Sequence, residues 1–220
     1  MPTFACQLLT AVGLATLASA KIAVNPETRQ LVDSDGRSVL FHGVNAVYKV
    51  DPYIPSNGAF DKDDSLNDED IDNLVSWGMN FVRLGVMWEG VERQPGVYDF
   101  EYLAKVDDLI RRMGAKGIYT MVDAHQDVFA RSICGEGVPD FYAKEALGNH
   151  ASCLGPLDDL LKPLYEKANW CGNMDDYGYA KDENGDFIIS DCQKINFGTY
   201  YTSPQSMKAF DALFENKNGL

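Results

Sequence analysis

The feature that most constrains the fold is residues 119–127, an apolar run that ends in a cluster of polar and titratable side chains. The same design occurs at residues 80–88 and 41–49, so three predicted strands end in polar groups. In an α/β barrel, the carboxyl ends of the parallel strands form the face that presents catalytic and substrate-binding groups. The pattern therefore predicts one site that collects side chains from three strand ends: Asn45, Lys49, Arg83, Trp88, His125 and Asp127.

Hydrophobic periodicity between these strands predicts an α/β fold with a parallel sheet. Asn67 can cap a helix whose apolar stripe is Ile71, Leu74 and Val75, and Gly78 ends it. A small hairpin is expected ahead of the first strand. The predicted segments are a hairpin from 22–24, 30–32 and 39–42, a strand at 40–45, a helix opening at 67, a strand at 80–84, a helix at 100–113 and a strand at 116–122.

Residues 128–205 differ in composition, being rich in Gly, Pro, Tyr and Asp. Long insertions in a compact domain are usually functional or disordered, and the cysteines and aromatic residues of this segment favour order. We therefore expect an ordered loop that follows the third strand and lies over the active face. Its best helical candidate is 158–168, and helical spacing returns at 206–214.

The first twenty residues are predicted to be a secretion signal. Residues 8–17 are apolar and small, and Ala18-Ser19-Ala20 fits the small-x-small cleavage rule, although no Lys or Arg precedes Lys21. The run is shorter than the roughly 20 apolar residues that span a membrane, so an N-terminal anchor is the less favoured alternative. We expect residues 1–20 to be removed and the mature chain to be secreted or to lie in a lysosomal or extracellular lumen.

The cysteines agree with that compartment. Cys134, Cys153, Cys171 and Cys192 remain after the signal, and an even set in an oxidising compartment predicts two disulfides with three possible connectivities. Free structural thiols are the alternative if the chain is not secreted. A zinc site is not predicted, because no pair has the short spacing of structural sites.

The charge of the chain excludes several classes of partner. The formal net charge is −14 at pH 7 without a basic stripe, which argues against nucleic-acid binding and against adhesion to an anionic membrane by charge alone. A metal site from Asp123, His125 and Asp127 is not predicted, because one imidazole and two carboxylates on one strand end fit no metal geometry well. No cofactor is expected.

Four segments together resemble the N-terminal part of endoglycoceramidases: residues 41–49, 60–63, 80–85 and 123–129. These proteins are clan-A, family 5 glycoside hydrolases with a (β/α)₈ barrel. The resemblance covers about residues 22–220 and implies a retaining enzyme that cleaves the bond between the oligosaccharide and the ceramide of glycosphingolipids. Residues 21–220 are thus expected to form the N-terminal part of a family 5 catalytic barrel, with a long Cys-containing loop at about 128–205.

The resemblance also implies two catalytic glutamates, an acid/base in an Asn-Glu-Pro motif on strand four and a nucleophile on strand seven. Neither motif is in this sequence, so both are expected beyond Leu220. A retaining glycosidase needs two carboxyl groups about 5 to 5.5 Å apart that flank the sugar. Asp123 and Asp127 belong to one strand end and could not form that pair. The 220-residue chain, with three β/α units where a barrel needs about 250 residues, is therefore predicted to be an inactive fragment.

Each matched residue has an implied role and a structural alternative. Arg83 would orient a catalytic carboxylate, or form a salt bridge inside the barrel. His125 would donate to substrate hydroxyls, or be a satisfied buried histidine. Asp127 would accept hydrogen bonds from sugar hydroxyls, or cap a loop.

Three further assignments follow from strand-end position or from the resemblance. Lys49 would reach the glycan, or be an ordinary surface lysine. Asn45 would support the end of the first strand, with direct contact as the alternative. Trp88 would stack on a sugar face or fill the barrel mouth.

The resemblance pairs Cys134 with Cys192, which leaves Cys153 with Cys171. The lipid part of the substrate would need an apolar groove, and contact with a lipid surface or micelles is expected to be transient. Candidates for this groove, chosen by position, could equally form a loop core beneath the disulfides: Phe129, Ile133, Val138, Phe141 and Tyr142.

Four other interpretations remain open at this point. The protein could be a family 5 enzyme of β-glucanase or glucosylceramidase type, or a non-catalytic glycan or glycolipid binder. It could be a small three-layer α/β domain, although three strands would leave parallel edges uncovered. It could also be a truncated chain without a stable fold.

Overall fold

The computed structural model describes residues 22–147, 160, 174–183 and 185–216. The chain divides into two compact units, Met1–Phe41 and His42–Leu220. In the small unit, β1 (Ala23–Val24) pairs antiparallel with β2 (Leu31–Val32), and Val32 bridges to Ser38. The predicted hairpin is thus present, but its last segment makes a single bridge, and the next strand begins at Gly43 rather than at Leu40.

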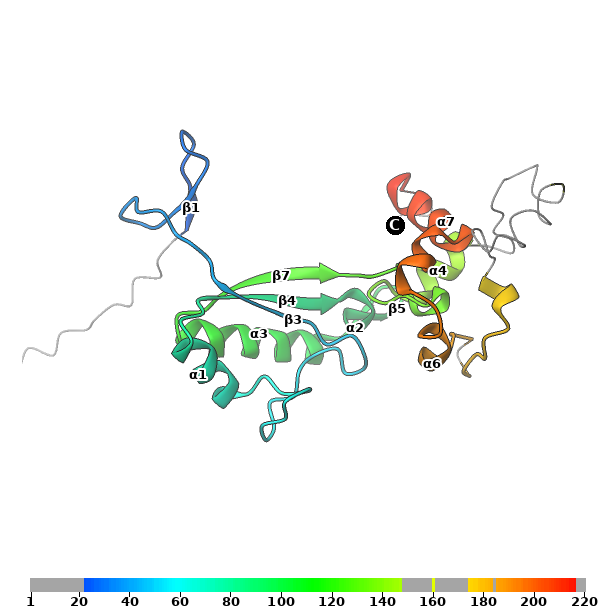
Figure 1. Ribbon diagram of the computed structural model, residues 1–220, viewed down its shortest axis with the longest axis horizontal. Helices are drawn as coiled ribbons and strands as arrows, with labels where there is room; N and C mark the ends of the chain where they lie inside the picture. The colour runs from blue at the N-terminus through cyan, green and yellow to red at the C-terminus, as the bar shows by residue number, and fades with distance from the viewer. Residues whose placement is uncertain (1–21, 148–159, 161–173, 184, 217–220) are drawn as a thin grey trace, which may run out of the picture. The chain divides into compact units, whose positions relative to one another are not determined.

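The large unit is built on a parallel sheet with the strand order β3-β4-β7. These strands are β3 (Gly43–Ala46), β4 (Phe81–Met87) and β7 (Tyr119–His125). Helix α1 (Asp68–Ser76) joins the first two, and helix α3 (Phe100–Ala115) precedes the third. Figure 1 shows both helices on one face of the sheet. The predicted order of strand, helix, strand, helix, strand is confirmed.

The covered face of the sheet holds the first hydrophobic core. Val82 and Leu84 of β4 are buried, and Ile71 of α1 packs with them. Leu109 and Met113 of α3 complete this core, and each is 1% exposed or less. The alternation that buries Val82 and Leu84 directs the intervening side chains to the opposite face. That face carries Asn45 and Arg83 in register, so the sheet separates an apolar layer from a polar one.

The ends of α1 follow from local chemistry. The Asn67 side chain accepts from the Asp70 amide at 3.1 Å, and the Asp70 carboxylate accepts from the Asn67 amide at 2.9 Å. This capping box satisfies amide groups that an α-helix leaves unpaired at its start. Gly78 has φ +77°, a conformation that costs glycine little, and it turns the chain into β4. Both predicted ends of this helix are confirmed.

Between β4 and α3 lie three short elements that periodicity did not predict. They are α2 (Trp88–Val91), β5 (Glu92–Gln94) and β6 (Val97–Tyr98). Elements of two to four residues are too short for a hydrophobic pattern to repeat, so periodicity cannot indicate them.

The segment after β7 forms a second core from short helices. These are η1 (Arg131–Ile133), α4 (Asp140–Leu147), η3 (Met174–Tyr177), α6 (Ile189–Cys192), η4 (Phe197–Thr202) and α7 (Pro204–Phe214). Helix α7 confirms the helical spacing at 206–214, with Ser203 as its cap. The helix predicted at 158–168 lies outside the described residues, apart from Leu160.

The second core contradicts part of the lipid-groove hypothesis. Phe129, Ile133 and Val138 are at most 5% exposed and pack with Met174 and Tyr200. They are the core of the segment, as the alternative had it, because the short helices around them bury their side chains together. No helix among the described residues is both long and apolar enough to cross a bilayer.

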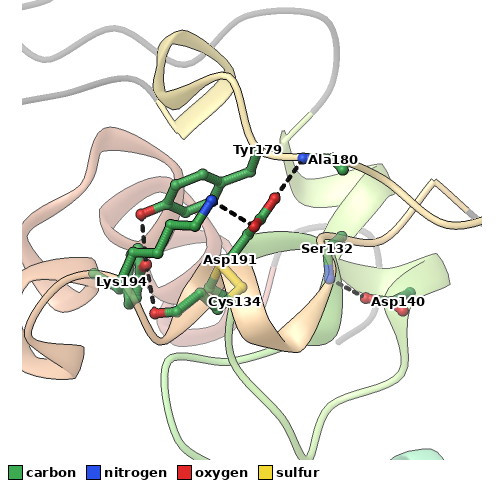
Figure 2. The surroundings of a disulfide bond; sticks show 9 residues. Ser132, Cys134, Asp140, Tyr179, Ala180, Asp191 and Lys194 are labelled. Atoms are coloured by element: carbon green, nitrogen blue, oxygen red, sulfur yellow. Dashed lines mark hydrogen bonds and ion pairs between the residues drawn. A yellow bond between two sulfur atoms is a disulfide. The ribbon is translucent and has the colours of Figure 1, made fainter.

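A disulfide between Cys134 and Cys192 fastens this segment, with the two Cα atoms 5.5 Å apart (Figure 2). This is the pairing that the resemblance implied. The sequence separation is 58 residues, and a loop of that size corresponds to about 4 kcal/mol in the chain-entropy account. Beside it, Lys194 donates to Asp191 and Asp191 accepts from the Ala180 amide. The predicted pair Cys153 with Cys171 lies outside the described residues.

Gly137 is expected to be the least replaceable residue of the loop after β7. An added Cβ would lie 2.2 Å from the His125 carbonyl oxygen, and φ is +111°. We expect Gly137→Ala to lower the free energy of unfolding by roughly 3 kcal/mol or more, because overlap adds to a positive-φ cost of about 1 to 3 kcal/mol. Gly96→Ala, also at positive φ but with open space around it, should show only the second cost. Denaturant unfolding of both variants measures this, and equal losses would contradict it.

Candidate functional site

The carboxyl end of β7 holds a chain of three side chains. Asp123 Oδ2 lies 2.5 Å from Arg83 Nη2 and 2.8 Å from His125 Nδ1. The other ring nitrogen of His125, Nε2, lies 3.2 Å from Asp127 Oδ2. Each ring nitrogen thus faces a carboxylate oxygen, and the ring can donate to both only in its protonated form. The strand end is therefore a connected network of polar contacts from Arg83 to Asp127.

Lys49, from the loop after β3, joins this network through two carboxylates. Its Nζ lies 2.5 Å from Asp127 Oδ2 and 2.7 Å from Glu136 Oε1. The other Asp127 oxygen accepts from the Tyr201 hydroxyl at 3.1 Å. Three strand-end residues predicted to share a site, Lys49, His125 and Asp127, are thus brought together.

Glu136 was not predicted as a site residue. Its side chain is only 7% exposed in the structure. The loop after β7 folds back so that the backbone groups of Asp127 and Glu136 exchange hydrogen bonds at 2.9 and 2.8 Å. Gly135 and Gly137 flank Glu136, and a Cβ at either would meet backbone within 2.5 Å. The Gly-Glu-Gly triplet was the available signal, because glycine on both sides of an acid marks a close approach of two backbones. Tyr201 had no signal, since 74 residues separate it from Asp127.

The pairing fixes the charge states of Lys49 and Asp127. Burial lowers the pKa of Lys49, but the hydrogen bonds to Asp127 and Glu136 outweigh it and the pKa is raised. Burial likewise raises the pKa of Asp127, but the hydrogen bond from Lys49 outweighs it and the pKa is lowered. Both residues are therefore charged at neutral pH, and Asp127 can accept a hydrogen bond from a hydroxyl group.

The other predicted residues lie around this network. Arg83 pairs with Asp123, which is the salt bridge that its structural alternative describes. Asn45 is exposed and in register beside Arg83. Trp88 donates from Nε1 to Glu92 at 2.7 Å and packs on Tyr142 with ring centroids 4.7 Å apart, so its contacts favour a packing role.

A largely buried acid that the sequence did not indicate, Glu89, supports the loop after β7. Glu89 accepts from the Gly137 amide at 2.7 Å and from the Tyr53 hydroxyl at 3.2 Å. Arg131 lies 3.8 Å from Glu89, and its guanidinium also donates to the Lys49 carbonyl. Burial raises the pKa of Glu89. These contacts hold the loop that carries Glu136 against the strand ends.

One group of side chains could in principle hold a metal ion. Ligand atoms of His125, Asp127 and Glu136 lie within 4.8 Å of one another. The Lys49 ammonium already contacts both carboxylates and neutralises charge where a cation would bind. The arrangement is therefore better suited to hydrogen-bonding a polar, uncharged ligand.

The parallel sheet and the polar strand ends define the class: part of an α/β barrel whose site lies at the carboxyl ends of the strands. Residues 32–189 match the family described as Cellulase (glycosyl hydrolase family 5). The chain belongs to glycosyl hydrolase family 5.

Several relatives share this part of the fold. The chain is 37% identical over 203 residues to an endoglycoceramidase of Cyanea nozakii, covering 92% of this chain and 36% of the relative. It is 33% identical to an endoglycoceramidase of Hydra vulgaris, covering 90% and 35%. The solved structure of endo-glycoceramidase II from Rhodococcus sp. aligns with a TM-score of 0.50 at 26% identity, covering 86% of this chain and 34% of that one. The chain thus spans about a third of the length of the curated relatives it matches.

A carboxyl pair in the segment after β7 is expected to make the stability of that segment depend on pH. Asp140, at the start of α4, accepts from the Ser132 amide at 2.8 Å (Figure 2). Asp186 lies 3.1 Å from Lys144. Burial, followed by the hydrogen bond with Asp140, raises the pKa of Asp186 to about 6 from 3.8. The folded state thus holds this proton more tightly than the unfolded chain.

The stabilisation that protonated Asp186 gives to the folded state is complete below pH 3.8 and is lost as the pH rises to about 6. We therefore expect the urea concentration at half-unfolding to decrease as the pH is raised from 4 to 6. This decrease should be smaller in Asp186→Asn. Glu183→Gln, an exposed acid of the same segment, is the matched control and should keep the wild-type slope. If the half-unfolding urea concentration of Asp186→Asn changed with pH as steeply as that of the wild type, a group other than Asp186 would cause the pH dependence.

Proposed function

We propose that this chain forms the glycan-binding part of the active face of a retaining family 5 glycosidase that cleaves glycosphingolipids between oligosaccharide and ceramide. The observation that carries the proposal is the contact of Lys49 and His125 with Asp127, at the carboxyl ends of two parallel strands. The relatives from Cyanea nozakii and Hydra vulgaris, both endoglycoceramidases, support the substrate class.

The chemistry of this cluster suits sugar hydroxyls. Asp127 is ionised; its Oδ2 contacts Lys49 and His125, and its Oδ1, which accepts from the Tyr201 hydroxyl, has a second lone pair that can accept from a sugar hydroxyl. Lys49 presents further N–H donors, and its side chain is 43% exposed. His125 is held in one orientation by Asp123 at Nδ1, and its Nε2 lies 3.2 Å from Asp127, where a sugar hydroxyl bound to Asp127 can also contact it. These groups bind and orient, and none is proposed to protonate the leaving oxygen.

The two catalytic carboxylates are proposed to lie beyond Leu220. Asp123 is occupied by Arg83 and His125, and Asp127 is occupied by Lys49, Tyr201 and His125. Both start from one strand end, whereas a retaining mechanism needs an acid and a nucleophile on opposite sides of the scissile bond. Arg83 is proposed to orient the nucleophile, with Asp123 fixing its guanidinium.

Secretion or delivery to a lumen is part of the proposal. The signal predicted at residues 1–20 lies outside the described residues. The disulfide between Cys134 and Cys192 supports an oxidising compartment, because such bonds persist outside the reducing cytosol.

The direct test is glycan binding by the purified chain. We expect lactose to bind without hydrolysis, and Asp127→Asn to weaken binding by roughly tenfold or more, since a hydrogen bond to a charged group contributes about 1.5 to 3 kcal/mol. The control is Asp107→Asn, an exposed acid on α3, which should bind as the wild type does. Isothermal titration calorimetry measures both. Unchanged affinity in Asp127→Asn would refute the site.

The proposed role of Arg83 in orienting the nucleophile is tested by steady-state kinetics. The enzyme used is a longer protein that contains this chain together with both catalytic carboxylates. We expect Arg83→Ala to lower kcat more than it raises KM, by roughly 2 to 4 kcal/mol in barrier, because a charge-assisted hydrogen bond to the nucleophile matters most in the transition state. Arg111→Ala, on the exposed side of α3, is the matched control. Near-full kcat/KM on a glycosphingolipid would mean that Arg83 is barrel structure only.

A further inference from the structure

Glu89 is an acid of helix α2, and its side chain is only 9% exposed. The helix follows directly from β4, at the end of the sheet that carries the candidate site (Figure 1). A carboxylate removed from water costs free energy unless hydrogen bonds and nearby charges compensate for it. For Glu89, the compensating contacts come from the two loops that supply Lys49 and Glu136 to the site.

The loop after β7 is joined to Glu89 at Gly137, the neighbour of Glu136. The Gly137 amide donates to Glu89 Oε1 at 2.7 Å, and the Glu89 amide donates to the Gly137 carbonyl at 2.9 Å. A side chain at position 137 would overlap the His125 carbonyl, so the chain passes here at close range. The two hydrogen bonds therefore fix the backbone next to Glu136, whose carboxylate lies 2.7 Å from Lys49 Nζ.

The loop after β3 is joined to the same carboxylate through Tyr53 and Arg131. The Tyr53 hydroxyl donates to Glu89 Oε2 at 3.2 Å, and Arg131 Nε lies 3.8 Å from that oxygen. Arg131 Nη2 donates to the Lys49 carbonyl. A guanidinium is planar and presents its N–H groups in a fixed fork, so a charge that orients one edge also orients the other. The charge of Glu89 is thus linked through Arg131 to the backbone of Lys49.

We infer that Glu89 is a positioning residue for the glycan contact at Asp127. Its ionised carboxylate holds the loop that carries Glu136. Through Arg131 it also holds the backbone of Lys49, the residue that contacts both Glu136 and Asp127. The inference rests on the proposed function. It adds that the glycan affinity depends on the ionisation of a side chain that does not itself bind the glycan.

The surroundings of Glu89 place its titration in an acidic range. Burial raises the pKa of Glu89 above its ordinary value of 4.5, and the charge of Glu136 adds to this rise. The Gly137 amide, Arg131 and the Tyr53 hydroxyl oppose the rise without cancelling it. Other titratable or charged side chains interact with Glu89 or line the cavity of about 310 Å³ beside it: Arg93, Tyr102, Glu92, Asp140, Lys144 and Asp186.

Asp127 titrates in a lower range than Glu89. Its pKa is lowered from 3.8, because its burial, which raises the pKa, is outweighed by the hydrogen bond from Lys49. As the pH falls, Glu89 therefore gains its proton before Asp127 does. Protonated Glu89 has no charge to orient Arg131. The glycan affinity should thus be complete above the pKa of Glu89 and decrease as the pH falls through it.

The test is the affinity of the purified chain for lactose between about pH 7 and about pH 4. Isothermal titration calorimetry measures it, and circular dichroism checks folding at each pH. Glu89→Gln keeps an acceptor for the Gly137 amide but carries no charge. At about pH 7 it should bind lactose roughly two- to tenfold more weakly than the wild type, the size expected for a residue that acts through others.

The two proteins should bind lactose equally near pH 4, because Glu89 is then uncharged in the wild type as well. A decrease caused by another group of the site, such as His125, would occur in both proteins and would not remove the difference between them. A purely structural effect of the substitution would keep the same difference at every pH. The convergence of the two affinities is therefore specific to the charge of Glu89.

A second variant changes the titration of Glu89 without replacing it. Tyr53→Phe removes the hydroxyl whose hydrogen bond lowers the pKa of Glu89. We expect the decrease in lactose affinity to begin at a higher pH in Tyr53→Phe than in the wild type. The matched control is Glu92→Gln, which removes the charge of another buried acid, one that accepts from Trp88 and Gly96. It should bind lactose as the wild type does at every pH.

The outcomes separate this inference from the proposed function. If lactose binds at no pH, both are wrong. If lactose binds to the wild type without an acidic decrease, or if Glu89→Gln differs from the wild type by the same factor at every pH or not at all, Glu89 does not position the site through its charge and the proposed function stands. If Glu89→Gln does not fold, Tyr53→Phe decides, and an unshifted pH profile in that variant overturns the inference.

Discussion

The Lys49 ammonium, shared between Asp127 and Glu136, is the interaction on which the site depends. It ties the loop after β3 to the end of β7 and to the loop that folds back over that end. The carboxylates of Asp127 and Glu136, with oxygen atoms within 4.8 Å of one another, would repel each other without a cation between them. The same ammonium takes the place where a metal could bind, and it leaves the cluster close to neutral. A polar surface that can recognise hydroxyl groups is the result.

The parallel sheet makes this cluster possible by separating two chemistries. One face packs Val82 and Leu84 against α1 and α3, and the burial of these apolar side chains stabilises the fold. The other face presents Arg83, and the strand ends add His125, in register with the last residue of β4. Because neighbouring parallel strands end at the same edge, residues far apart in sequence meet there.

The segment after β7 adds a second structural layer to that edge. It has its own core, its own disulfide and a cavity that opens beside Lys49. Its acid pair, Asp140 and Asp186, is expected to make its stability decrease as the pH rises from 3.8 to about 6. The sheet therefore positions Lys49, His125 and Asp127, and the segment after β7 adds Glu136 and Tyr201 to them.

The sequence by itself determined the β/α order, the Asn67 cap, the Gly78 stop and the strand-end positions of Lys49, His125 and Asp127, because period and capping are local chemistry. It did not determine the elements between Trp88 and Tyr98, which are too short to have a period. It also missed Glu136, Glu89 and Tyr201. Their partners lie 48 to 87 residues away, so only the folded chain decides those contacts: Glu136 lies against Lys49, Glu89 against Gly137 and Tyr201 against Asp127.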